Sequence, residues 1–162
     1  FALRSYYRKT YRAFTQIARP GTRFIFSDAF SPRLMNGVVR SLKDFPVVMD
    51  VHLYHMTTLG AKYKSIEWCF TKTIQRKRLL ERLGRTQPIM IGEWSGVLRG
   101  DVLRHVAKED IPRLESEYMK LQLSVYEAVD VWCYWNYKTE QPGLWNFRSL
   151  VENGDIVTSH QG

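Results

Sequence analysis

The sequence predicts an α/β fold in which helices cover a parallel sheet. Segments with helical periodicity alternate with short apolar segments of strand length, and no repeat, linker or low-complexity stretch interrupts the series. Such alternation suits either a doubly wound sheet or a section of a (β/α)₈ barrel. The chain has 162 residues, of which 44% are hydrophobic, so we expect one folded unit over residues 1–162 and not a disordered tail.

The helices are predicted from apolar residues that recur every three or four positions. The expected helices cover 1–19, about 33–43, 66–84 and 111–128. Gly84 is expected to close the third of them, and its apolar side should include Ile74. Asp110 is expected to cap the fourth, and Pro112 falls in its first turn, where proline is tolerated.

Four apolar segments are predicted to be strands. They are residues 23–26, 46–52, 88–93 and 130–135. The second is apolar without strict alternation, which is typical of a strand covered on both faces. The remainder, beyond residue 135, is expected to be irregular or to hold a short helix.

Polar or aromatic side chains appear where each predicted strand ends. In chain order they are Asp28, the pair His52 and Tyr54, Glu93, and Trp135. In a barrel these carboxyl ends converge on one mouth, where the fold places its chemistry. A doubly wound sheet would instead gather its site at one switch point. The pattern therefore favours the barrel.

Glu93 is the strongest candidate for a functional residue. A carboxylate directly after Ile-Met-Ile-Gly is costly to bury without partners, although a structural arginine would also explain it. Gly92 leaves room for a close backbone approach or a bulge. His52 and Tyr54 are two residues apart and so face the same way, either to bind a carboxylate or a sugar hydroxyl or as a core pair. Trp135 fits a stacking surface or the core.

The positive charge does not by itself predict a nucleic-acid-binding protein. The chain has 24 Lys and Arg against 16 Asp and Glu, a net charge of +8. The densest basic stretch, residues 72–85, has its charges between apolar residues at helical spacing, which indicates a solvated helix face. Diffuse attraction to polyanions remains as a further hypothesis. No apolar run approaches the roughly 20 residues that a membrane span needs.

Neither metal chemistry nor cysteine chemistry is predicted. His52 and His55 are three apart at a strand end, without a carboxylate triad beside them. Cys69 and Cys133 form no disulfide framework and lack the setting of a nucleophile. Ser95 is not in a Gly-x-Ser-x-Gly elbow. We therefore expect no metal and no cofactor.

Several segments resemble glycoside hydrolase family 5, and most closely its branch of exo-β-1,3-glucanases and glucan 1,3-β-glucosidases. They lie in the same order as in that family, at residues 26–30, 48–54, 88–95, 134–140, 145–148 and 152–154. The resemblance implies strands five to eight, the C-terminal half, of a TIM (β/α)₈ barrel. It also implies hydrolysis of O-glycosyl bonds in β-glucans or β-glucosides, without a cofactor.

The resemblance assigns roles residue by residue. Glu93 falls on the family's catalytic nucleophile. The residues that fall on substrate-binding positions are His52, Tyr54, Trp135 and, as weaker candidates for lining the cleft, Asp28 and Trp94. A retaining glycosidase places its two carboxyl groups about 5–5.5 Å apart, one as nucleophile and one as acid/base.

The sequence departs from the family by lacking its second carboxyl group. The Asn-Glu-Pro motif that carries the family's acid/base does not occur here. We therefore expect the N-terminal half of the barrel to be a missing partner, and the isolated chain to be inactive or crippled. No nucleic acid or membrane partner is expected. The alternative is a catalytically inactive half-barrel that binds carbohydrate or a protein partner.

Overall fold

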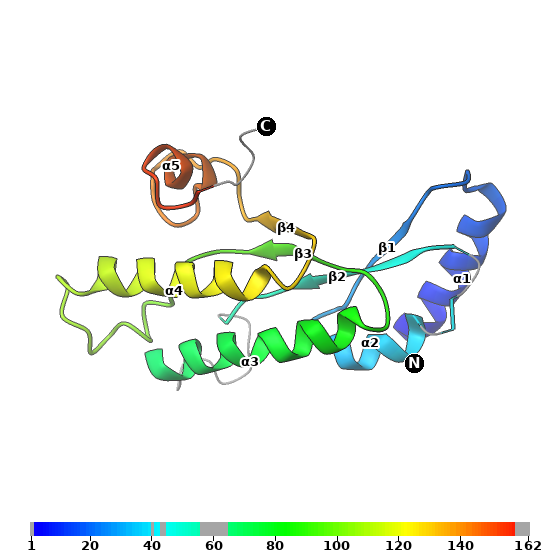
Figure 1. Ribbon diagram of the computed structural model, residues 1–162, viewed down its shortest axis with the longest axis horizontal. Helices are drawn as coiled ribbons and strands as arrows, with labels where there is room; N and C mark the ends of the chain where they lie inside the picture. The colour runs from blue at the N-terminus through cyan, green and yellow to red at the C-terminus, as the bar shows by residue number, and fades with distance from the viewer. Residues whose placement is uncertain (1, 40, 43–44, 56–64, 158–162) are drawn as a thin grey trace.

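The computed structural model describes residues 2–39, 41–42, 45–55 and 65–157. Its centre is a parallel sheet whose strands are β1 (Phe24–Ser27), β2 (Val47–His52), β3 (Ile89–Trp94) and β4 (Val131–Tyr134). The helices are α1 (Ala2–Ile17), α2 (Pro32–Val39), α3 (Ile66–Gly84), α4 (Ile111–Tyr126) and α5 (Phe147–Glu152). Figure 1 shows α2 and α3 below the strands, α4 at the level of β2 and β3, and α5 above them.

The order of the strands across the sheet is β1-β2-β3-β4, the same as their order in the chain. A doubly wound sheet contains a point where this order reverses, and the described sheet has none. Parallel strands joined in chain order by right-handed connections carry all their helices on one face. This singly wound sheet is compatible with half of a (β/α)₈ barrel.

The core lies between one face of the sheet and the helices. Alternate strand residues point into it, so that the buried side chains of β1 to β3 include Phe24, Phe26, Met49, Val51, Ile89 and Ile91. They share one cluster with residues from all five helices, among them Tyr11, Met35, Leu80, Met119 and Leu150. The described sheet and all five helices therefore contribute to one continuous core.

The opposite face of the sheet is only partly covered. Ile25 is 55% exposed on β1 and Val131 is 50% exposed on β4, and Cys133 is exposed as well. On β2, Val48 is buried while Asp50 is half-buried. Burial on both faces, expected for the second strand, is thus confirmed only for its first part. Within the residues described, this face is open at both outer strands.

Helix α3 is rotated slightly from the orientation that the sequence predicted. Ile74, expected on the apolar side, is 57% exposed, and Thr73 is buried in its place. The Thr73 hydroxyl donates to the Cys69 carbonyl at 3.0 Å, which removes the cost of burying it. Ser65 caps the helix through its side chain, and the helix includes Gly84 before it ends.

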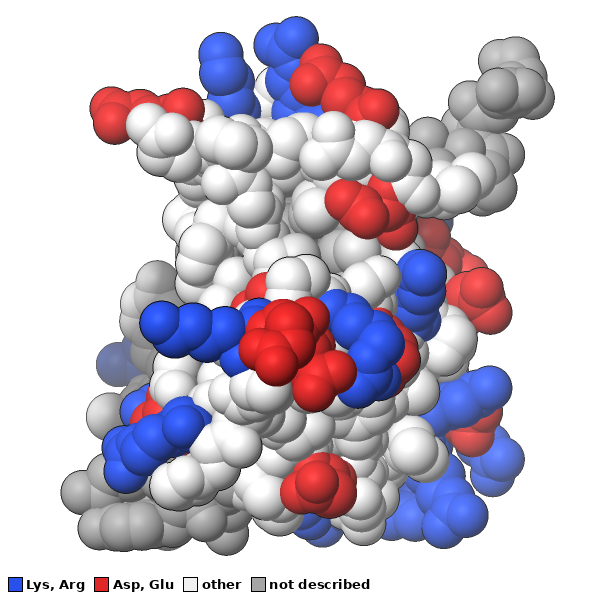
Figure 2. Space-filling model, turned by 90° about the vertical axis from the view of Figure 1, so that its left-hand side faces the viewer, with Lys and Arg blue, Asp and Glu red and all other residues white. Residues whose placement is uncertain are grey.

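Charged residues on α4 form ion pairs with their neighbours. Asp110 occupies the N-cap position as predicted, but its side chain makes no capping hydrogen bond. It pairs with Arg113 at 3.1 Å, and Arg113 also contacts Glu117 at 2.9 Å. Figure 2 also shows acidic and basic side chains next to each other, mainly in a band across the middle of the face in view. The view gives no continuous basic surface of the kind that tracks a nucleic acid.

Gly92 allows β2 and β3 to approach closely, as the sequence predicted. A Cβ atom on Gly92 would lie 2.0 Å from Oδ1 of Asp50. The pairing of the two strands also shifts here, between Val51 and His52. Asp50 therefore projects over the backbone of β3 at a position where only glycine leaves room.

Replacing Gly92 with alanine is expected to lower the free energy of unfolding by about 1–3 kcal/mol. The added methyl group would displace the Asp50 carboxylate from His52, whose Nε2 lies 3.1 Å away. Gly37→Ala is the matched control, since Gly37 lies in α2 with open space around its Cα. The control should be neutral or more stable by about 0.5–1 kcal/mol. Urea unfolding followed by circular dichroism measures both, and equal stability of the two variants would contradict the close contact.

Candidate active site

Five ionisable side chains gather at the carboxyl ends of β1, β2 and β3. We call them the carboxyl-end cluster: Asp28, Asp50, His52, Tyr54 and Glu93. Strand pairing brings them together, because Ser27 lies opposite Asp50 and His52 lies opposite Glu93. The strands in Figure 1 point to the left, so the cluster belongs to that end of the sheet. Four of the five were predicted from the sequence.

The Glu93 carboxylate is held at one of its two oxygens. The Tyr54 hydroxyl donates to Oε2 at 3.2 Å, and Nδ1 of His52 lies 3.5 Å from the same oxygen. Among the described residues, no donor reaches Oε1. The side chain is 29% exposed, so solvent or a ligand can reach it. The arrangement fixes the carboxylate plane while leaving one oxygen available.

The imidazole of His52 lies between two carboxylates. Its Nε2 is 3.1 Å from Oδ2 of Asp50, and its Nδ1 faces Glu93. Asp50 was not singled out from the sequence, although two signals were present. It is two residues before His52, so both face the same way from the strand, and it faces a glycine on β3.

Tyr54 is both a donor to Glu93 and a fixed point of the backbone. Burial, and then the nearby charge of Glu93, raise the pKa of Tyr54 above its ordinary value. The phenol therefore keeps its proton and remains a donor across the neutral range. Its own carbonyl accepts a hydrogen bond from Nη2 of Arg76 at 3.1 Å. Arg76 on α3 thereby helps to hold the segment after β2.

Asp28 is buried at the end of β1, with 1% of its surface exposed. Burial is the main cause that raises the pKa of Asp28 to about 6, while the Phe30 backbone amide and the charge of His52 lower it. The Phe30 N–H donates to Oδ1 of Asp28 at 3.0 Å. Ala29 and Phe30 have φ values of 49° and 56°, a region that such residues seldom adopt. The turn after β1 is thus held in a strained form beside the cluster.

The two tryptophans considered from the sequence have different environments. Trp135 is 50% exposed, and its backbone N–H donates to the Trp94 carbonyl at 2.8 Å, which places it beside the end of β3. Trp94 is 0% exposed. Its ring packs against Tyr126, Trp132 and Tyr134, with centroids 5.0, 5.4 and 4.7 Å away. The expectation that Trp94 lines the cleft is therefore wrong, because its side chain lies on the helix side of the sheet.

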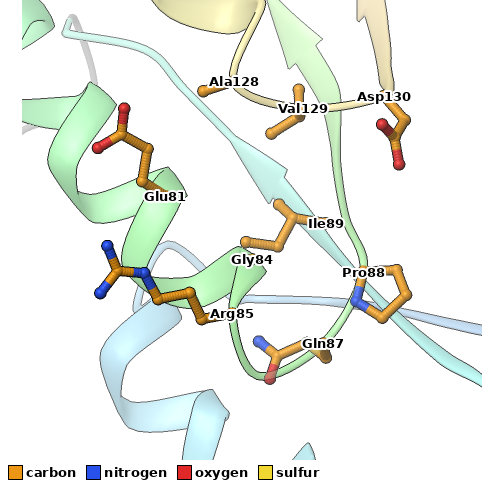
Figure 3. A pocket seen from close by; sticks show the side chains of 9 residues that line it. All are labelled: Glu81, Gly84, Arg85, Gln87, Pro88, Ile89, Ala128, Val129 and Asp130. Carbon is orange, nitrogen blue, oxygen red and sulfur yellow. The ribbon is translucent and has the colours of Figure 1, made fainter.

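A separate cavity lies at the opposite, amino end of β3 and β4 (Figure 3). Its volume is about 440 Å³, and it is lined by the end of α3, the start of β3 and residues 128–130. No member of the carboxyl-end cluster lines it. Ligands of open parallel sheets bind outside the carboxyl ends of the strands, so we assign no catalytic role to this cavity.

No group of three or more His, Cys, Asp or Glu side chains within the described ranges is arranged to hold a metal ion. No helix in those ranges combines the length and apolar character that a membrane crossing requires.

Comparison with known proteins finds relatives that share one name. The chain is 26% identical to the probable glucan 1,3-beta-glucosidase A of Aspergillus terreus, over 94% of this chain and 43% of that protein. It is 27% identical to the Aspergillus niger protein of the same name, over 97% of this chain and 44% of the relative. It is 40% identical to the glucan 1,3-beta-glucosidase of Yarrowia lipolytica, over 82% of this chain and 39% of that protein. The chain spans about two fifths of the length of these curated relatives. No protein-family model matches it.

Asp28→Asn is expected to change how stability depends on pH. In the unfolded chain an aspartic acid ionises near pH 4, whereas burial raises the pKa of Asp28 in the folded chain to about 6. The stability contributed by the protonated carboxyl is therefore complete below about pH 4 and is lost as pH rises through about 6. The asparagine variant should gain stability relative to the wild type between pH 4 and pH 7.

Urea unfolding of both proteins at pH 4, 5, 6 and 7 measures this difference. Burial lowers the pKa of His55 to about 3, so His55 destabilises the fold as pH falls below its unfolded value. That contribution is present in both proteins and cancels in the comparison. A difference that stays constant over the range would contradict the burial of an ionisable Asp28.

Proposed function

We propose that this chain is the C-terminal half, strands five to eight, of a (β/α)₈ barrel in a retaining glycoside hydrolase of family 5 that acts on β-glucans or β-glucosides. The observation that carries the proposal is the position of the Glu93 carboxylate and the contacts of its two oxygens. Its carboxylate stands at the carboxyl end of a strand, with Oε2 held by Tyr54 and His52 and with Oε1 unoccupied by any described donor. This is the arrangement that a carboxylate nucleophile needs.

The comparisons support the glycosidase class. The relatives named glucan 1,3-beta-glucosidase are 26–40% identical over most of this chain. Since the chain spans about two fifths of their length, the proposal assigns the other strands and the acid/base carboxyl to the part of the barrel that this chain does not include. The sheet supports the same proposal, because its strands are singly wound and one face is open at both outer strands.

In the proposed mechanism, Oε1 of Glu93 attacks the anomeric carbon of the sugar. A bond forms between that carbon and Oε1 while the glycosidic bond breaks, and the leaving oxygen takes a proton from the acid/base glutamate outside this chain. Water, activated by the same acid/base, then releases the sugar and restores Glu93. Both steps change the charge on Glu93, so the donors at Oε2 keep the carboxylate in one orientation throughout.

The remaining residues of the site bind the sugar. Trp135 offers an exposed indole face beside the end of β3, which suits the apolar face of a sugar ring. His52 and Tyr54 orient the nucleophile and can bond sugar hydroxyls. Asp28 supports the turn that closes β1 next to His52. No cofactor takes part in this chemistry.

Covalent trapping tests the nucleophile without requiring the acid/base. A 2-fluoro β-glucoside with a very good leaving group needs little protonation to react, and its glycosyl-enzyme hydrolyses slowly. Intact mass spectrometry should show one glycosyl adduct on the wild-type chain, and peptide mapping should place it on Glu93. The Glu93→Gln protein should give none, because the amide cannot attack. A wild-type chain that circular dichroism shows to be folded but that forms no adduct would favour the alternative, an inactive half-barrel that binds carbohydrate or a protein.

Tyr54→Phe is expected to slow this trapping by about 10–100-fold, the effect of losing one hydrogen bond to a charged group. The variant keeps the ring and removes only the hydroxyl that donates to Glu93. Tyr6→Phe is the matched control, since Tyr6 is 60% exposed on α1 and should label at the wild-type rate. Equal labelling rates for the Tyr54 variant and the wild type would show that this donor does not orient the nucleophile.

A further inference from the structure

A second cavity lies beside α3 and shares no residue with the carboxyl-end cluster. It has a volume of about 270 Å³, smaller than the roughly 300–1,000 Å³ of most ligand pockets. Its walls come from α2, from His55 shortly after β2, and from one side of α3. Its lining includes Arg33, His55, Trp68, Lys72 and Arg76. None of the described residues that line it is a carboxylate.

The three cations of this cavity have only neutral partners or none among the described residues. Nη2 of Arg76 donates to the Tyr54 carbonyl at 3.1 Å, and Nζ of Lys72 donates to the Gln75 side chain at 2.9 Å. No described carboxylate pairs with Arg33, Lys72 or Arg76. Three like charges around one cavity repel each other, so an anion placed between them would lower the electrostatic energy.

His55 adds no charge to the cavity. Burial, and then the charges of Arg76 and Lys72, lower the pKa of His55 to about 3, so its imidazole is neutral near pH 7. The Thr73 hydroxyl donates to the Cys69 carbonyl and so accepts from Nε2 of His55, at 3.0 Å. The Trp68 ring stands 5.4 Å from the imidazole at 78°. An aromatic wall therefore accompanies the three charges.

We propose that this cavity binds a phosphate group, either as the free ion or as the head of a small phosphomonoester. Guanidinium groups present planar pairs of donors that match phosphate oxygens, and an ammonium adds a point charge. Two guanidiniums and one ammonium are more than sufficient to neutralise a phosphate dianion. The Trp68 ring and Leu79 can pack against the organic part of an ester. The site is independent of the glycosidase proposal, since it uses none of that chemistry.

Isothermal titration calorimetry on the 162-residue chain at low salt tests the site, with inorganic phosphate and glucose 6-phosphate as probes. We expect saturable binding at one site per chain, with a dissociation constant in the millimolar range or below. Unphosphorylated glucose at the same concentrations should give no signal there. Tighter binding of glucose 6-phosphate identifies an ester as the ligand, and equal or tighter binding of inorganic phosphate identifies the free ion; both support the proposal.

Arg33→Gln and Lys72→Gln should each weaken phosphate binding about tenfold or more, which corresponds to the loss of about 1.4 kcal/mol. Both side chains reach solvent, so the variants should keep the wild-type circular dichroism spectrum. Lys77→Gln is the matched control, because Lys77 is exposed on the same helix outside the cavity, and its effect should stay within about twofold. The proposal is overturned if binding does not saturate, or if Lys77→Gln weakens it as much as the cavity variants do, since either result indicates diffuse attraction to a chain of net charge +8.

Discussion

The imidazole of His52, held between Asp50 and Glu93, is the contact on which the carboxyl-end cluster depends. Three carboxylates approach one another at this end of the sheet, and carboxylates placed together without donors are unfavourable. The two ring nitrogens of His52 lie 3.1 and 3.5 Å from two of these carboxylates. His52 reaches both only because Gly92 has no side chain where the Asp50 carboxylate lies. A glycine on one strand thus permits a histidine on the next to organise the site.

The orientation of Glu93 is fixed from the other face of the sheet. Trp94 follows Glu93 directly, and neighbouring residues of a strand point to opposite faces. Trp94 packs among Tyr126, Trp132 and Tyr134, whereas the Glu93 carboxylate lies against Tyr54 and His52 at the ends of the strands. A hydrogen bond also holds this aromatic group in place, since the Tyr134 hydroxyl accepts from the Gly96 backbone N–H at 2.9 Å. Packing on the helix side therefore determines where the reactive carboxylate can be.

The sequence was sufficient to predict the series of helices and strands and most of the cluster, because both depend on local patterns. Apolar segments that end in a polar residue located Asp28, His52, Tyr54 and Glu93. Asp50 was overlooked because it interrupts an otherwise apolar strand, and its role depends on a glycine 42 positions later in the chain. Only the pairing of β2 with β3 reveals that relation.

Two other differences arise from tertiary packing. Adjacency in sequence predicts that Trp94 lies with Glu93, but the Trp94 ring packs into the aromatic group on the helix side. Helical periodicity favours Ile74 on the buried side of α3, yet Thr73 is buried there instead. Its hydroxyl makes hydrogen bonds with both the Cys69 carbonyl and the His55 imidazole. A buried hydroxyl with both partners costs little, so hydrophobicity alone did not decide the orientation.

Arg76 contacts both the carboxyl-end cluster and the cavity beside α3. It is one of several basic residues in the stretch 72–85, for which the sequence predicts a solvated helix face. In the fold, its guanidinium donates to the carbonyls of Leu53 and Tyr54, at 3.5 and 3.1 Å. Those bonds fix the segment whose Tyr54 hydroxyl holds Glu93, but they leave the positive charge of Arg76 without a described counter-ion. The same side chain therefore stabilises the carboxyl-end cluster through its hydrogen bonds and contributes to the neighbouring cavity through its charge.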